Sequence, residues 1–167
     1  MAGDQVYLER VSSNVTEALF AALMSILLVL GIWHMNWNGW DILSVVLFCL
    51  SGLFLFYMLN YRILIIRITA ESVVLTFGIF TWSIPMENID ACRLDEIPEL
   101  MRFGGAGIHF MSVRRRYRAS FNFLEYPRVV ISLRKNIGPV RDISFSTRRP
   151  DEILQLIQDA VSTKEAA

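Results

Sequence analysis

Four arginines placed almost side by side are the residues of this 167-residue sequence with the clearest capacity for binding. They are Arg114, Arg115, Arg116 and Arg118. Each cation held close to an anionic membrane surface contributes ~1 kcal/mol of attraction, so four together would hold a domain against such a surface. The same charges would also pair with acidic residues of a partner protein. We therefore predict that this segment contacts lipid or a protein partner, with a solvated loop as the alternative.

Two other polar segments precede the arginines. Asp95, Glu96 and Glu99 form an acidic cluster that would attract the arginines of the same or a neighbouring molecule, although a solvated loop is the preferred interpretation. The glycine-rich segment 104–107 is followed by Ile-His. The phosphate-binding loop of a nucleotide hydrolase needs Lys-Ser/Thr there. We therefore expect a tight turn or bulge with positive φ rather than a nucleotide site.

Residues suited to catalysis or metal binding are sparse. The two histidines, His34 and His109, are predicted to lie on opposite sides of a membrane. Cys49 lies in an apolar run and Cys92 in a polar region, so we expect neither a disulfide nor a metal site from them. We predict no catalytic residues, cofactor or metal. Coordination of a haem or pigment metal by His34 is a weaker alternative to simple hydration.

Two apolar runs, 17–33 and 41–60, are the first elements that would position the candidate functional residues. Hydrophobic residues make up 54% of the chain, and no Lys or Arg lies between Val11 and Tyr61. Each run is close to the ~20 residues that cross a hydrocarbon core of roughly 30 Å as a helix. The sequence after Trp33 is a poor cleavage site, and a second run follows at once. We therefore predict an uncleaved transmembrane hairpin rather than a signal peptide.

The basic residues beside these runs predict their orientation. Arg10 precedes the first run, Arg62 and Arg67 follow the second, and the link 34–40 has no Lys or Arg. Basic residues favour the cytoplasmic side, so we predict an inner-membrane protein with both termini cytoplasmic. Aromatic side chains favour the membrane–water interfaces. The residues expected at the outer interface are Trp33, Trp37 and Trp40, and those at the inner interface are Tyr57 and Tyr61.

Small residues recur at helical spacing in the first run. Ala18 with Ala22, and Ala21 with Ser25, form two small-xxx-small pairs. Such pairs allow another helix to approach closely. We favour their use in the seam of the hairpin itself, with a helix of a partner as the alternative.

Short runs rich in β-branched residues begin at Arg62, where the apolar runs end. The segments 128–134 and 140–146 alternate apolar and polar residues, which is typical of antiparallel strands with one buried face. A helix is predicted to start near Pro150, because Asp151 and Glu152 suit a helix N-terminus and apolar residues then follow on one stripe. The other predicted strands are 62–69, 73–77, 79–84, 88–93 and 117–123.

This order of elements resembles the bacterial pleckstrin-homology-like (PH-like) domains of small membrane proteins with two transmembrane helices. The residues that carry the resemblance lie in the segments 102–108, 129–133 and 143–154, which match a "GG-x-GI" segment, a strand and a "(S/T)-x-R-P-(D/E)-E-(L/I)" helix start. It covers roughly residues 62–160 and the preceding hairpin. It implies no catalytic residues and a role in scaffolding or lipid contact. The arginine-rich insert 111–118 departs from the pattern.

We therefore predict an α+β chain in four parts. These are an N-terminal tail (1–16), a transmembrane hairpin (17–61), a cytoplasmic PH-like domain (62–162) built of antiparallel strands and a C-terminal helix, and a short tail (163–167). The predicted function is that of a non-catalytic accessory or scaffold subunit of a larger membrane complex, a photosynthetic or respiratory one being an example. A membrane-anchored module that binds anionic headgroups is the alternative. Membrane lipids and integral membrane proteins are the expected partners. From Arg62 onward the sequence carries 15 basic and 12 acidic residues, too small an excess for nucleic acid.

Overall fold

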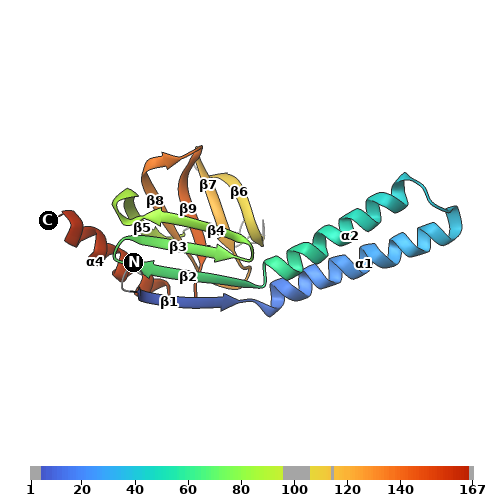
Figure 1. The fold of residues 1–167 in the computed structure, drawn as a ribbon, viewed down its shortest axis with the longest axis horizontal. Coiled ribbons are helices and arrows are strands. Elements are labelled where there is room, and N and C mark those ends of the chain that lie inside the picture. Colours follow the sequence, from blue (N-terminus) through green and yellow to red (C-terminus); the bar gives the residue numbers. More distant parts are fainter. Residues whose placement is uncertain (1–4, 96–105, 114, 166–167) are drawn as a thin grey trace.

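The computed structural model describes residues 5–95, 106–113 and 115–165. A long helical hairpin extends from one end of a β domain, and the first and last described elements both belong to that domain (Figure 1). The elements that precede the second sheet are β1 Gln5–Ser12, α1 Asn14–Asn38, α2 Ile42–Asn60, β2 Ile63–Thr69, β3 Ser72–Phe77, β4 Phe80–Pro85 and a 3-10 turn Met86–Asn88. They are followed by β5 Ile89–Leu94, β6 Gly107–Val113, β7 Arg116–Asn122, β8 Arg128–Ile137, β9 Val140–Ser146 and α4 Pro150–Glu165.

The two hairpin helices confirm the prediction of two segments long and apolar enough to cross a membrane. α1 begins earlier than expected, because Ser13 caps it by accepting a hydrogen bond from the Thr16 amide. Asp41 caps α2 in the same way through the Ser44 amide. Most of their apolar side chains are exposed, so the helices bury little surface within the chain. Two helices of this kind indicate association with a membrane.

The first sheet has the order β1-β2-β3-β4 and is antiparallel throughout. Its strand β1 corrects the prediction of an N-terminal tail, because Gln5–Ser12 pairs along the whole of β2. Alternate residues of β1 explain this: Tyr7 and Val11 are buried in the core, whereas Leu8 and Arg10 are exposed.

The second sheet has the order β5-β8-β9-β7-β6 and corrects two predictions. β7 and β9 pair in parallel, whereas antiparallel strands alone were expected. The arginine-rich segment is also not a loop, since most of its described residues belong to β6 and β7, which form a hairpin that turns at Arg115. The predicted strands 128–134 and 140–146 correspond to β8 and β9, which form a hairpin with Ile137 opposite Val140.

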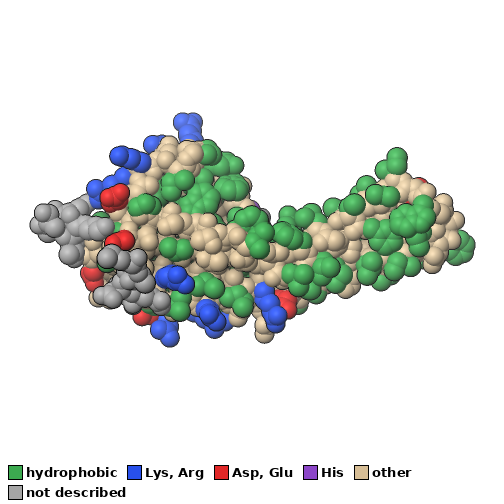
Figure 2. All heavy atoms as spheres, viewed as in Figure 1, with side chains coloured by type: hydrophobic (Ala, Val, Ile, Leu, Met, Phe, Trp, Pro, Cys, Tyr) green, Lys and Arg blue, Asp and Glu red, His purple; other side chains and the backbone are tan. Residues whose placement is uncertain are grey.

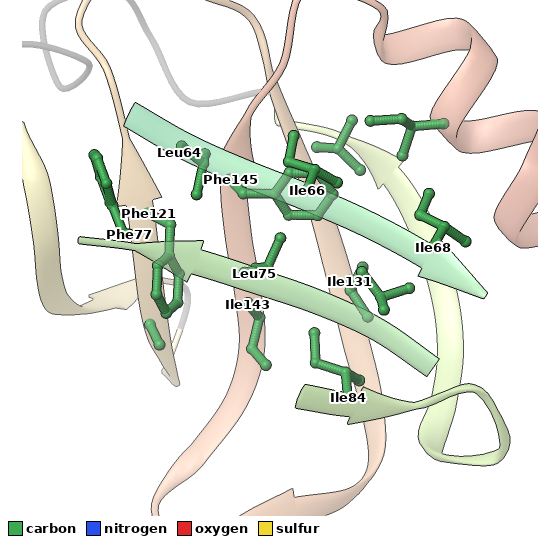
Figure 3. Close-up of a cluster of buried hydrophobic side chains, with 14 of the residues drawn as sticks. Leu64, Ile66, Ile68, Leu75, Phe77, Ile84, Phe121, Ile131, Ile143 and Phe145 are labelled. Atoms are coloured by element: carbon green, nitrogen blue, oxygen red, sulfur yellow. The ribbon is translucent and has the colours of Figure 1, made fainter. Parts of the chain in front are cut away.

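The hydrophobic core lies between the two sheets. Figure 3 shows side chains from β2, β3 and β4 facing side chains from β7, β8 and β9. Complete burial of a side chain of this kind contributes roughly 1.5–3 kcal/mol, so this interface accounts for much of the domain's stability. The labelled members are Leu64, Ile66, Ile68, Leu75, Phe77, Ile84, Phe121, Ile131, Ile143 and Phe145.

The C-terminal helix α4 confirms the prediction of a helix after Pro150. Ile153 and Ile157 are fully buried, four residues apart on the face that packs on β5. Glu9 of β1 also holds the start of this helix, because its carboxylate accepts hydrogen bonds from the Thr147 hydroxyl at 2.6 Å and the Arg148 amide at 2.9 Å. The described chain is therefore an α+β protein in which β1 is bonded to the start of α4.

Candidate functional site

The structure describes three of the four predicted arginines and gives them different surroundings. Arg115 lies exposed at the β6–β7 turn with φ 65°, and Arg116 and Arg118 belong to β7. Arg114 lies outside the described residues. Side chains two apart on a strand share a face, so Arg116 and Arg118 both project from the face of the second sheet that points away from the core.

A buried ion-pair network binds Arg118. Its Nη1 lies 2.9 Å from Asp95 Oδ1, and its Nη2 lies 3.9 Å from Asp142 Oδ2. Arg116 approaches the other oxygen of Asp142 at 3.2 Å, and Ser132 donates a hydrogen bond to that oxygen at 3.0 Å. The side chain of Asp142 is 1% exposed and that of Arg118 is 2% exposed. Charges removed from water in this way persist only when they are paired and hydrogen-bonded.

This network corrects the prediction that Arg118 contacts lipid or a partner. A guanidinium that is 2% exposed is held by Asp95 and Asp142 and does not reach an external surface. The pairing of Asp95 with an arginine is the intramolecular attraction considered from the sequence. Glu96, Glu99 and the glycines 104–105 lie outside the described residues.

Among the described residues, the polar face that carries this network contains several buried groups with unused hydrogen-bonding atoms, Asp95 Oδ2 among them. Asn122 is fully buried, and neither its amide nitrogen nor its amide oxygen has a partner. Arg118 Nε is also unpartnered. Near them, burial and the charge of Arg128 lower the pKa of His109, so this imidazole is neutral at neutral pH. Buried polar groups normally have a partner, and a bound water or small polar ligand would supply one here.

The other histidine lies at the tip of the hairpin. His34 Nε2 is 2.9 Å from Asp41 Oδ2, and its Nδ1 is 3.1 Å from the Asn38 side-chain amide. Both ring nitrogens are therefore engaged within the hairpin, which gives no support to a metal bound by His34. Among the described residues, no three His, Cys, Asp or Glu side chains are grouped as a metal site. Cys49 and Cys92 are both free thiols.

The hairpin seam uses other residues than the predicted small-residue pairs. Ser51 donates a hydrogen bond to the Met24 carbonyl at 3.1 Å, and Gly31 lies against Leu47 and Phe48. Ala18, Ala22 and Ser25 are instead exposed, and their spacing of four and three residues places them on one stripe of α1. Ala21 is half-buried. The structure therefore disfavours the interpretation that this stripe packs in the seam between α1 and α2. Contact with a helix of a partner is the interpretation that remains.

The predicted interfacial aromatics separate into two groups. Trp33, Trp37 and Trp40 are strongly exposed at the hairpin tip. Tyr57 is half-buried, and Tyr61 is buried where the hairpin joins the domain. The ring of Tyr61 lies 5.0 Å from that of Phe77 and against Gly107. Tyr61 is therefore part of a packed junction rather than an exposed interfacial residue.

An exposed aromatic surface lies along the edge strands β4 and β6 and was not predicted from the sequence. The rings of Phe110 and Tyr117 stack at 5.9 Å with an interplanar angle of 7°, although they are 51% and 40% exposed. On β4, Phe80 is exposed and Trp82 is half-buried against Phe121. Figure 2 shows hydrophobic side chains gathered over β6 and β7. We call Phe80, Trp82, Phe110 and Tyr117 the aromatic surface.

Comparisons with family models, with curated proteins and with solved structures find no match for this chain.

Proposed function

We propose that this chain is a non-catalytic accessory subunit of a larger integral membrane complex. Its hairpin would pack against transmembrane helices of the partner, and its β domain would dock on the partner's cytoplasmic face. The observation that carries this proposal is the aromatic surface. Exposed apolar patches on a soluble domain mark interaction sites, and buried aromatic side chains supply a large share of binding energy at interfaces.

The position of the aromatic surface favours a protein as its partner. β4 and β6 are the outer strands of their sheets, so each leaves unpaired backbone groups beside the aromatic rings. The stacked rings of Phe110 and Tyr117 form a rigid surface that loses little entropy on binding. Arg115 is exposed at the adjoining turn. A complementary partner surface would therefore be apolar, with acidic residues at its rim.

The exposed stripe on α1 supports a second contact within the bilayer. Ala18, Ala22 and Ser25 are exposed and would allow a partner helix to approach closely. The expected partner is therefore itself an integral membrane protein. It would meet this chain at two levels, in the hydrocarbon region and on the cytoplasmic surface.

A cytoplasmic location of the β domain is part of the proposal. Arg10 and Arg62 flank the hairpin on the domain side, whereas the short link at its tip has no Lys or Arg. We also propose a PH-like relationship for the domain, supported by two packed sheets followed by a C-terminal helix. The parallel pairing of β7 with β9 departs from the all-antiparallel arrangement that we expected.

The test is copurification in mild detergent from the native membrane, with identification of the partners. We expect one or more integral membrane proteins at fixed stoichiometry. A photo-crosslinker placed at Phe110 should reach a cytoplasmic segment of the same protein. The matched control position is Leu8, which is similarly exposed on β1 of the other sheet.

Substitution of the stacked pair tests the aromatic surface directly. Removal of two buried aromatic rings costs on the order of 4 kcal/mol at an interface hot spot. We therefore expect the variant Phe110→Ala/Tyr117→Ala to lose the partner during purification, while Leu8→Ala retains it. Recovery of the wild-type chain alone as a monomer, or undiminished recovery of the partner with the double variant, would contradict the proposal.

A further inference from the structure

We propose that an anionic phospholipid binds in a hollow where the hairpin joins the β domain, with its phosphate between Arg10 and Arg62. The hollow lies on the outer face of the first sheet and shares no lining residue with the aromatic surface. Lipid binding at this hollow does not depend on an accessory-subunit role.

Four elements converge to form the hollow. β1 and β2 leave the hairpin side by side, and the β3–β4 turn approaches the end of α2 so closely that Gly78 lies against the Asn60 carbonyl. The hollow has a volume of about 330 Å³. It is open to solvent, so a headgroup can enter from the side. Its main lining residues are Arg10, Leu59, Arg62, Ile63, Ile65 and Thr76.

The charge of the hollow suits a phosphate. Arg10 is exposed and forms no ion pair among the described residues. Arg62 lies 3.3 Å from Glu17, but its side chain is 65% exposed. An exposed ion pair of this kind contributes only ~0–1 kcal/mol, so the guanidinium remains available to a ligand. Figure 2 shows basic and acidic side chains together where the domain meets the hairpin.

The apolar part of the lining distinguishes a lipid from a soluble anion. Leu59 in the last turn of α2 and Ile63 at the start of β2 are 67% and 42% exposed. They continue the apolar surface of α2, whose 19 residues span roughly 28 Å at 1.5 Å per residue. The hollow therefore lies where the hydrocarbon region gives way to headgroups. An acyl chain would follow Leu59 while the phosphate meets the two arginines.

The experiment uses the full chain, purified in detergent and delipidated, with dioleoyl-phosphatidylglycerol as the probe and native mass spectrometry as the measurement. We expect Arg10→Gln and Arg62→Gln each to weaken binding of this lipid about five-fold, since each cation contributes ~1 kcal/mol. Arg67→Gln is the matched control, because Arg67 is exposed on the same face of β2 but does not line the hollow. It should leave binding unchanged.

Two further measurements test the roles of Arg62 and of the acyl chains. If Arg62 acts only by pairing with Glu17, then Glu17→Gln will weaken binding as much as Arg62→Gln; we expect no weakening, because a repelling carboxylate is removed. Glycerol 1-phosphate should compete poorly, because it lacks acyl chains. Equal loss with Arg67→Gln, equal affinity for dioleoyl-phosphatidylcholine, or competition by glycerol 1-phosphate at the concentration of the lipid would each overturn the proposal. Unchanged unfolding temperatures of the variants show that the fold is kept.

Discussion

The thiol of Cys92 reports on the stability of the β domain. Burial raises the pKa of Cys92 to about 12, so at pH 9 almost none of this thiol is in its reactive thiolate form. In a Cys49→Ala background, we expect alkylation of Cys92 in the folded chain to be about a thousand-fold slower than that of a free thiol. Mass spectrometry of chains treated with iodoacetamide measures this rate. Rapid alkylation under native conditions would show that β5 is not held as described.

The sign of the pH dependence follows from the same shift. The unfolded thiol ionises near pH 9, whereas the folded thiol stays protonated until about pH 12. Between these values the unfolded state binds fewer protons, so Cys92 makes the fold less stable as pH rises. Below pH 9 this contribution does not change. The denaturant concentration at the midpoint of unfolding should therefore decrease as the pH is raised from 9 to 12. This decrease should be smaller in Cys92→Ala.

The carboxylate of Asp142 stabilises the polar face of the second sheet. It is 1% exposed and lies near three guanidinium groups, those of Arg93, Arg116 and Arg118. Asp142→Asn would leave buried positive charge without full compensation, which costs about 3 kcal/mol. If iodoacetamide reaches Cys92 only when the domain unfolds, this loss of stability should raise the alkylation rate of Cys92 about a hundred-fold. Arg149→Gln, which breaks an exposed pair with Glu152, is the control and should change the rate little.

At the scale of elements, the β3–β4 turn joins the domain to the hairpin. A Cβ atom added at Gly78 would lie 2.4 Å from the Asn60 carbonyl oxygen, and backbone cannot move aside as a side chain can. Gly138 in the β8–β9 turn has the same φ of +60° but has no atom within 4 Å of such a Cβ. The two glycines therefore separate the cost of steric overlap from the cost of positive φ.

We expect Gly78→Ala to lower the unfolding temperature clearly more than Gly138→Ala. Positive φ costs roughly 1–2 kcal/mol in both variants, and steric overlap adds about 1–3 kcal/mol in the first alone. Spin labels on exposed positions of α1 and β8, such as Ile26 and Lys135, should show a broader distance distribution in Gly78→Ala. Equal effects of the two substitutions would mean that the turn does not fix the domain on the hairpin.

At the scale of the whole molecule, β1 and α4 must lie on the same side of any membrane that the hairpin crosses. β1 pairs with β2, and its Glu9 binds Thr147 and the Arg148 amide just before α4. The elements before and after the hairpin thus belong to one folded domain. This constraint follows from the fold and does not depend on where the basic residues lie. The distribution of basic residues separately predicts that the domain is cytoplasmic.

Labelling with a membrane-impermeant maleimide tests this topology. In intact cells carrying a Cys49→Ala background, Trp37→Cys in the hairpin tip should react from outside, whereas Lys135→Cys should react only after the membrane is opened. The buried Cys92 serves as an internal negative control. Reaction of Lys135→Cys in intact cells would reverse the proposed orientation, and reaction of neither variant would argue against spanning.

Local pattern alone determined the two helices of the hairpin, the α4 helix and most strands of the sheets. A run of ~20 apolar residues becomes a helix whatever surrounds it, because each backbone group pairs within the run. Alternation along β9 and the apolar stripe in α4 likewise depend only on neighbours in sequence. These predictions were confirmed in type, with ends shifted by a few residues.

Tertiary structure decided which residues distant in the sequence pair with each strand or neutralise each charged side chain. Residues 5–12 include two charged residues and several polar ones, and they became a strand because β2 offered an unpaired edge. Arg118 could not be assigned to the interior from its arginine-rich neighbours, since the carboxylates that neutralise it come from residues 95 and 142. Of the arginines predicted as one binding loop, the three that the structure describes thus differ in their surroundings, because the charge that each one meets is set by strand pairing and not by position in the sequence.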